Sequence, residues 1–262
     1  MCQRNQLKWP PNGHTGEIPP SKLSDRLDAL GLSTFLDYYY QLKYAHNSDQ
    51  EWDKLTDALS VQETYFWREA DQFRVLTDLL LPQVRAGSAL PIKIWCAACA
   101  SGEEPYSIAI ALEESGWFTK SNVKILASDA SPSALKKALQ GIYRGRAFRA
   151  LPAQLREKYF SEVEAGWKIR PDIQSRVQFH QANLLDAKEV APLARATFIF
   201  CRNVFIYFST ATIARVVDQF AKDLSRPGYL FVGVSESLLR VPNSFQLEEV
   251  GGCFVYVQRE IP

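Results

Sequence analysis

The first third of the chain has the apolar spacing of amphipathic helices. One predicted helix carries apolar residues at i, i+3, i+4 and i+7, which are Leu32, Phe35, Leu36 and Tyr39. Ser33 stands near its start as a possible cap. A second helix is predicted from the similar spacing of Trp52, Leu55 and Leu59. Both helices should therefore bury these faces.

A third helix is predicted over residues 73–81, and Pro82 should end it, because the residue before a proline disfavours helical geometry. Residues 1–20 contain four prolines and no periodic pattern, so they are expected to be irregular. No alternation typical of strands occurs before residue 90. Residues 1–87 are accordingly predicted to form a small helical domain.

The pattern then changes to short apolar runs that alternate with helical segments. Strands are predicted at residues 92–97, 123–129, 177–184, 197–201, 229–234 and 254–257, the last as an edge strand. The helices between them include one with Ile108, Ala111 and Leu112 on one face, one over 132–139 and one over 209–224. This order predicts an α/β domain over residues 88–262 with a mostly parallel sheet, interrupted at about 158–180 by an inserted small β-subdomain.

Composition and charge narrow the class of protein. The 262 residues carry 30 basic and 29 acidic side chains, a net charge of +1, and 47% of them are hydrophobic. These values exclude a disordered chain and disfavour binding of nucleic acid through bulk charge. No run of 18 apolar residues and no signal-peptide pattern is found, so no membrane insertion and a cytoplasmic location are expected.

The cysteines could indicate a redox or zinc motif at Cys96-x-x-Cys99, but there is no second such motif and the three histidines are scattered. A structural role for this pair is favoured, and no metal site is predicted.

In an open α/β sheet, ligands bind at the carboxyl ends of the strands. The first such turn, residues 98–104, is rich in small residues and lacks the GxGxxG pattern of a dinucleotide site. Its acids Glu103 and Glu104 would repel a diphosphate and suit a positively charged ligand. Ser101 and Glu104 also have capping-box spacing, so Glu104 is either a cap or a ligand contact.

The end of the second predicted strand carries Asp129, 27 residues after Gly102. An acid at this place can accept hydrogen bonds from both ribose hydroxyls of an adenosine-containing cofactor, and it disfavours a 2′-phosphate. The alternative is a helix N-cap. The ribose role is favoured.

Further candidates follow the later strands or precede the sheet. Asn183 and the pair Arg202–Asn203 follow two strands, and could read an adenine edge or hold a turn. Tyr207 is either a core tyrosine or a residue that faces the reaction centre. Arg68, next to aromatic residues, could pack there or hold a carboxylate substrate.

Together these segments resemble the CheR family of chemotaxis receptor methyltransferases, which are S-adenosylmethionine-dependent protein-glutamate O-methyltransferases. The Ser-Gly-Glu-Glu-Pro-Tyr-Ser and Phe-Cys-Arg-Asn stretches are the most specific in combination. All matching stretches run in family order over residues 21–258: they are 64–69, 95–109, 127–129, 141–144, 182–185, 200–208 and 233–236.

The resemblance implies a helical N-terminal domain, a Rossmann-like class I methyltransferase domain and an inserted small β-subdomain. It implies a cofactor site formed by Gln62, Thr64, Arg68, Glu104, Asp129, Asn183, Leu184, Arg202 and Asn203. Arg68 and Tyr207 would stand at the reacting methyl group. The implied reaction converts a chemoreceptor glutamate to its methyl ester and leaves S-adenosylhomocysteine.

Two departures from the family pattern give the alternative function. Gln62 replaces a family-typical asparagine, and the helical domain is abbreviated. The chain could therefore be a signalling scaffold of the same fold that binds the cofactor with weak or lost methyltransferase activity. The expected partner is the cytoplasmic domain of a chemoreceptor, to whose arrays the protein could be recruited, and a monomer is expected. A nicotinamide-dependent dehydrogenase is disfavoured by the missing GxGxxG pattern.

Overall fold

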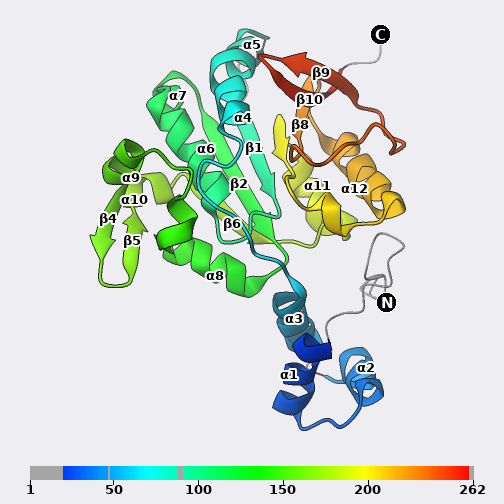
Figure 1. The fold of residues 1–262 in the computed structure, drawn as a ribbon. Coiled ribbons are helices and arrows are strands. Elements are labelled where there is room, and N and C mark those ends of the chain that lie inside the picture. The colour runs from blue at the N-terminus through cyan, green and yellow to red at the C-terminus, as the bar shows by residue number, and fades with distance from the viewer. Residues whose placement is uncertain (1–19, 47, 88–90, 260–262) are drawn as a thin grey trace.

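The structure, a computed structural model, describes residues 20–46, 48–87 and 91–259. Three helices lie together at one end of the molecule (Figure 1): α1 (Pro20–Leu30), α2 (Phe35–Tyr44) and α3 (Ser48–Leu59). The Glu51 carboxylate, almost fully buried between them, accepts hydrogen bonds from Arg26 Nη2 at 2.7 Å and Tyr38 Oη at 2.9 Å. Because each of the three helices supplies one of these residues, a single polar cluster fixes their arrangement.

The first predicted helix is confirmed as α2, but the prediction of which face it buries is wrong. Phe35, Leu36 and Tyr39 are 51%, 60% and 47% exposed, whereas Tyr38 and Leu42 are buried. Tyr38 must point inward to reach Glu51, and this turns the predicted face toward solvent. The cap is Thr34 rather than Ser33, since the Thr34 side chain accepts a hydrogen bond from the Asp37 N–H.

The main part of the chain is built on a seven-stranded sheet in the order β6-β2-β1-β7-β8-β10-β9. The first five strands in this order pair in parallel. β10 pairs antiparallel with both of its neighbours, β8 and β9. Their bounds are β1 (Ile92–Ala97), β2 (Val123–Asp129), β6 (Val177–Gln181), β7 (Phe198–Phe200), β8 (Gly228–Phe231), β9 (Gln246–Val250) and β10 (Cys253–Gln258). The predicted mixed α/β class is confirmed.

Alternate residues of these strands enter two separate cores, as the two-residue period of a strand requires. Ile94 and Cys96 of β1 pack with α6 (Glu103–Glu114) and α8 (Pro132–Gln140). Trp95 and Ala97 pack with the opposite layer, α11 (Ala187–Ala194) and α12 (Thr210–Asp223). Both faces of the sheet are therefore covered (Figure 1).

The predicted end of the third helix at Pro82 is wrong. The chain runs from α4 (Ala70–Arg74) through the π-helix η2 (Val75–Leu80) into α5 (Leu81–Gly87). Pro82 is the second residue of α5 and directly follows the π-helix. It has no N–H to donate, and the Thr77 carbonyl five residues earlier accepts instead from Trp117 Nε1 at 2.9 Å. Among the described residues, no helix has the length and apolarity of a membrane span.

The last strand is not at the edge of the sheet, contrary to expectation. β10 lies between β8 and β9, and β9 forms the edge. The sequence over 246–250, Gln-Leu-Glu-Glu-Val, is too polar for its strand pattern to stand out. The turn Gly251–Gly252, in which both residues have positive φ, joins the two strands.

A second, three-stranded antiparallel sheet in the order β3-β5-β4 lies beside the first. β4 (Phe160–Val163) and β5 (Gly166–Ile169) form a hairpin, and β3 (Ile142–Tyr143) precedes them by a segment that contains η3 (Gly145–Phe148) and α9 (Ala153–Tyr159). The predicted 158–180 segment thus covers only part of this unit, and its last residues belong to β6 of the main sheet. The remaining short helices are α7 (Trp117–Lys120), α10 (Pro171–Gln174) and η4 (Phe205–Tyr207).

Residues 60–69, the joining segment, connect α3 to α4 and so link the three N-terminal helices to the part of the chain built on the main sheet. Phe66 is fully buried among the rings of Tyr143, Phe148 and Phe160, with ring centroids 4.7–5.5 Å apart. Residues of α4, η2 and α5 share this core, while α1–α3 have a core of their own. We propose that the helical domain ends near Ser60, earlier than residue 87.

Replacing Phe66 with alanine should lower the free energy of unfolding by about 3–5 kcal/mol, because it leaves a cavity in a closely packed aromatic cluster. Urea denaturation measures this change. Phe254→Ala is the matched control, since Phe254 is 63% exposed and its removal should change stability by less than about 0.5 kcal/mol. Equal unfolding midpoints for the two variants would contradict the anchoring role of Phe66.

Candidate functional site

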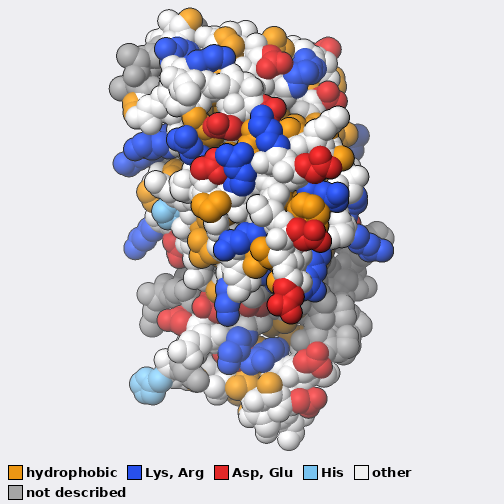
Figure 2. Space-filling view, turned by 90° about the vertical axis from the view of Figure 1, so that its left-hand side faces the viewer, with side chains coloured by type: hydrophobic (Ala, Val, Ile, Leu, Met, Phe, Trp, Pro, Cys, Tyr) orange, Lys and Arg blue, Asp and Glu red, His pale blue; other side chains and the backbone are white. Residues whose placement is uncertain are grey.

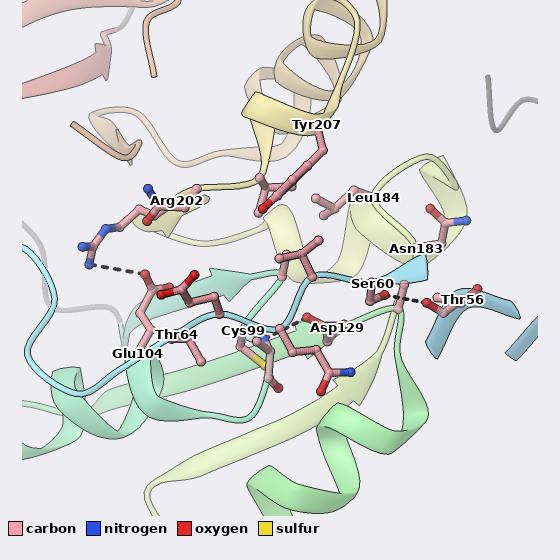
Figure 3. Close-up of a pocket in the computed structure, with 18 of the residues that line it drawn as sticks. Thr56, Ser60, Thr64, Cys99, Glu104, Asp129, Asn183, Leu184, Arg202 and Tyr207 are labelled. Carbon is pink, nitrogen blue, oxygen red and sulfur yellow. Dashed lines mark hydrogen bonds and ion pairs between the residues drawn. The ribbon is translucent and has the colours of Figure 1, made fainter. Parts of the chain in front are cut away.

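A cavity of about 250 Å³ opens at the carboxyl ends of β1, β2, β6 and β7. It includes the point between β1 and β7 at which the strand order reverses, which is where ligands bind in open α/β sheets. Figure 3 shows Arg202 and Tyr207 on one side of the cavity and Thr64, Cys99 and Asp129 on the other.

Every candidate residue from the sequence lines this cavity. They come from the joining segment, the first turn of α6, and the ends of β2, β6 and β7, and they are Gln62, Thr64, Arg68, Glu104, Asp129, Asn183, Leu184, Arg202, Asn203 and Tyr207. Segments up to 145 residues apart in the chain therefore meet in one place.

The capping box proposed for the first turn does not form. The N-cap of α6 is Gly102, which has no side chain to cap with, and the Ser101 hydroxyl donates instead to Glu103. Gly102 has a φ of +93°, and a Cβ there would lie 2.8 Å from the Ala138 Cβ. Glycine is therefore required by both the backbone and the close approach of α8. Glu104 is left free to point into the cavity.

Arg202 pairs with Glu104 and with two groups of the joining segment. Its side chain is 2% exposed, and its Nη1 lies 3.3 Å from Glu104 Oε2. Its Nη2 lies 3.2 Å from Glu69 Oε2 and donates to the Arg68 carbonyl at 2.7 Å. Burial raises the pKa of Glu104 to about 7, and the positive charge of Arg202 opposes this shift. A cationic ligand would favour the ionised form of Glu104.

Asp129 holds the loop on the opposite side. Its carboxylate accepts hydrogen bonds from the Ala100 N–H at 2.8 Å and the Ser131 N–H at 2.9 Å. The helix N-cap is Ser131 and not Asp129, because the Ser131 hydroxyl accepts from the Ala134 N–H. Burial raises the pKa of Asp129, and the accepted N–H groups oppose the shift. The N-cap alternative for Asp129 is therefore wrong.

The functional importance of Glu236 is not evident from the sequence alone, although it lies in one of the matching stretches. Its buried carboxylate accepts backbone N–H groups from Asn203, Val204, Phe205 and Gly233, each at 2.7 Å. A Cβ on Gly233 would lie 2.6 Å from Asn203 Nδ2. Glu236 thus fixes the backbone of the loop that carries Arg202 and Asn203.

Backbone strain is concentrated around the cavity. In the described part of the chain, the non-glycine residues with positive φ are Trp67, Glu69, Ala98, Ala100 and Asn203. All of them lie in the joining segment, the loop after β1 or the loop after β7, which line the cavity. Such conformations cost about 1–3 kcal/mol each and persist where the surroundings enforce them, typically at ligand sites.

The other candidates differ in how firmly they are held. Gln62 donates to the Ser131 hydroxyl at 3.0 Å, and Asn183 Oδ1 accepts from the Leu185 N–H at 2.9 Å. The polar contacts of the Arg68 guanidinium are long, 3.4 Å to the Glu63 carbonyl and 4.0 Å to Glu69. Tyr207 is half-buried and lies near the mouth with Arg68. Arg68 can therefore bind another group with little loss of existing interactions.

The helical domain supplies a wall that the sequence does not predict. Trp52, Leu55, Thr56, Leu59 and Ser60 of α3 and its end also line the cavity. Asp57 ties α3 to the first turn of α8, because it accepts from the Ser131 hydroxyl at 2.5 Å. The apolar spacing within α3 predicts a helix, but no local feature of the sequence indicates which surface that helix covers.

Cys96 and Cys99 are buried free thiols. Burial raises the pKa of both thiols well above the usual value, which keeps them protonated and poorly suited to attack a substrate. Among the described residues, no group of three or more His, Cys, Asp or Glu side chains could hold a metal ion.

The donor set defines the kind of ligand that fits. Asp129 can accept hydrogen bonds from vicinal hydroxyls, and Glu104 favours positive charge. Arg202 Nε is buried without a hydrogen-bond partner in the described structure, and a ligand carboxylate could accept from it. Leu184, Leu55 and Leu59 offer apolar surface to a flat ring. These features match the ribose, the charged amino-acid portion and the base of S-adenosylmethionine.

Comparison with known proteins agrees with this geometry. The family description "CheR methyltransferase, SAM binding domain" matches residues 62–252. Chemotaxis protein methyltransferase 2 of Vibrio cholerae is 36% identical over 87% of this chain and 80% of its own length. Chemotaxis protein methyltransferase 1 of Pseudomonas aeruginosa is 33% identical over 90% and 87%.

Among solved structures, the magnesium protoporphyrin IX methyltransferase of Synechocystis with bound SAM matches 84% of this chain and 93% of that chain. Its TM-score is 0.39 at 12% identity, which is too low to add to the assignment. The family match and the curated relatives carry it: the chain belongs to the CheR methyltransferase family, and its cofactor is S-adenosylmethionine.

Proposed function

We propose that this methyltransferase converts glutamate side chains of chemoreceptor cytoplasmic domains to methyl esters. The observation that carries the proposal is the separation of charge in the cavity. The acids that suit the cofactor, Glu104 and Asp129, line the same cavity as Arg68, which suits a carboxylate; the Glu104 side chain is 15% exposed and that of Arg68 is 29% exposed. The relatives named as chemotaxis protein methyltransferases support the same assignment.

The cofactor-binding residues divide by chemistry. Asp129 would hold the ribose, Glu104 and Arg202 the charged amino-acid portion, and Leu184 the base. Gln62, Thr64, Asn183 and Asn203, which line the same cavity, would supply the remaining polar contacts. When bound, S-adenosylmethionine supplies an electrophilic methyl group.

The acceptor needs no general base. A glutamate side chain has an ordinary pKa of about 4.3, so it is already ionised and nucleophilic at neutral pH. The contribution of the protein is to hold the carboxylate in reacting geometry, for which effective molarities reach about 10⁵–10⁸ M. Arg68 would orient the carboxylate. Tyr207 would form one wall of the position where the reaction occurs. The loose hold on Arg68 favours this role, because an arginine already bound to a carboxylate would have to release it.

The direct test is incubation with S-adenosylmethionine labelled in the methyl group and a chemoreceptor cytoplasmic fragment. A base-labile methyl ester on glutamate should form. A variant fragment whose acceptor glutamates are replaced by alanine is the control. If S-adenosylhomocysteine binds tightly but no receptor fragment gains an ester, the glutamate reaction is excluded.

Asp129→Ala should weaken S-adenosylhomocysteine binding by about 100-fold, because two hydrogen bonds to a charged group are lost. Isothermal titration calorimetry measures the affinity. Asp218→Ala, on the exposed side of α12, is the control and should bind as the unaltered protein does. An unchanged affinity in the folded Asp129→Ala variant would remove this residue from the ribose role.

Arg68→Ala should reduce turnover by about 100-fold or more while S-adenosylhomocysteine affinity changes by less than about fivefold, since its contribution is made mainly to the acceptor. Steady-state kinetics and calorimetry on one preparation separate the two effects. Equal losses of turnover and cofactor affinity would make Arg68 a cofactor-binding residue only.

A further inference from the structure

Two arginines contact one aromatic ring at the mouth of the cavity. The guanidinium carbon of Arg149 lies 3.7 Å from the centroid of the Tyr65 ring, and that of Arg68 lies 5.4 Å from it. Tyr65 and Arg68 line the cavity, and Arg149 lies on the ring beyond that lining. The positive surface that begins at Arg68 therefore continues outward.

Arg149 is held at this place by tertiary contacts. It directly follows η3, whose Ala147 carbonyl accepts from the Phe66 N–H at 2.8 Å. The rings of Phe66 and Phe148 stack with centroids 5.5 Å apart. Because Phe66 belongs to the same segment as Tyr65 and Arg68, the backbone of Arg149 is fixed relative to the mouth.

Arg149 already forms an ion pair with a carboxylate of the protein itself. Glu63 Oε1 lies 3.2 Å from Arg149 Nη2, and the side chains are 73% and 39% exposed. Glu63 and Tyr207 line the same cavity. Exposed ion pairs contribute about 0–1 kcal/mol, and a competing carboxylate can displace Glu63 at little cost.

The stretch of the chain that carries Arg149 is basic although the whole chain is nearly neutral. Residues 136–176 contain ten Lys and Arg and four Asp and Glu, a local charge of +6, so the rest of the chain carries −5. These residues run from α8 through the second sheet, and basic side chains recur across that side of the molecule (Figure 2). An acidic segment would be attracted to it.

We propose that Arg149 binds an acidic side chain of the methyl-accepting segment, and that Glu63 occupies this place until the acceptor displaces it. The acceptor is therefore an acidic polypeptide with a second carboxylate near the glutamate to be methylated. This inference rests on the proposed function, since it extends the acceptor site from Arg68 to Arg149.

The two partners of this ion pair should affect the acceptor in opposite directions. Arg149→Ala should weaken binding of a receptor cytoplasmic fragment by about tenfold, because a charged hydrogen bond to the acceptor is lost. Glu63→Gln should tighten it by up to about fivefold, because the internal competitor is removed. On the Arg149→Ala background, Glu63→Gln should have no further effect. A merely structural ion pair predicts instead that both single variants weaken binding.

The experiment uses the full chain saturated with S-adenosylhomocysteine and measures the Kd of the fragment, with the KM of the fragment measured in parallel. Cofactor affinity should stay within about twofold in every variant. Arg195→Ala and Asp223→Asn are matched controls. Arg195 precedes β7 and Asp223 ends α12 before β8, so this pair, 3.4 Å apart, lies at the amino ends of these strands, away from the cavity at their carboxyl ends.

Changes of the same sign in Arg149→Ala and Glu63→Gln, or no change in either, would overturn the inference. Those results concern fragment binding and are obtained whether or not an ester forms. Failure of the unaltered protein to methylate the fragment would instead count against the proposed function.

Discussion

The site depends on one buried cation. The Arg202 guanidinium is nearly inaccessible to water, and an unpaired charge in such a place costs several kcal/mol. It is compensated by Glu104 of α6, Glu69 and the Arg68 carbonyl of the joining segment. These pairs require three distant segments to meet at the ends of the central strands. Glu236 completes the arrangement, because it fixes the loop from which Arg202 projects.

Apart from Arg202, whose charge Glu104 and Glu69 compensate, the charged side chains around the cavity differ in exposure. Glu104 and Asp129 lie inside, where burial raises the pKa of both carboxyl groups. Arg68 and Arg149 lie toward the mouth, where water and Tyr65 stabilise them. The acids favour a cation and the two arginines favour an anion, which is the arrangement that the proposed transfer from a sulfonium cofactor to a carboxylate acceptor would require.

The local hydrophobic pattern predicted which helices and strands form better than it predicted what they pack against. The main strands and the helices between them follow from short apolar runs, and the strand-end rule selected residues that do line one cavity. The errors occurred where a distant partner overrides a local preference. Tyr38 turns inward for Glu51, and Ser101 pairs with Glu103 instead of capping. β10 becomes internal because polar β9 pairs with it.

The sequence by itself determined the α/β class, the carboxyl-end placement of Asp129 and Arg202, and the family, because periodicity and motif spacing are properties of neighbouring residues. Only the tertiary structure decided that α3 forms a wall of the cavity, that Glu104 pairs with Arg202, and that Arg149 stacks on Tyr65. The last two contacts join residues that are 98 and 84 positions apart. Such contacts arise from the packing of whole elements, and no local preference specifies them.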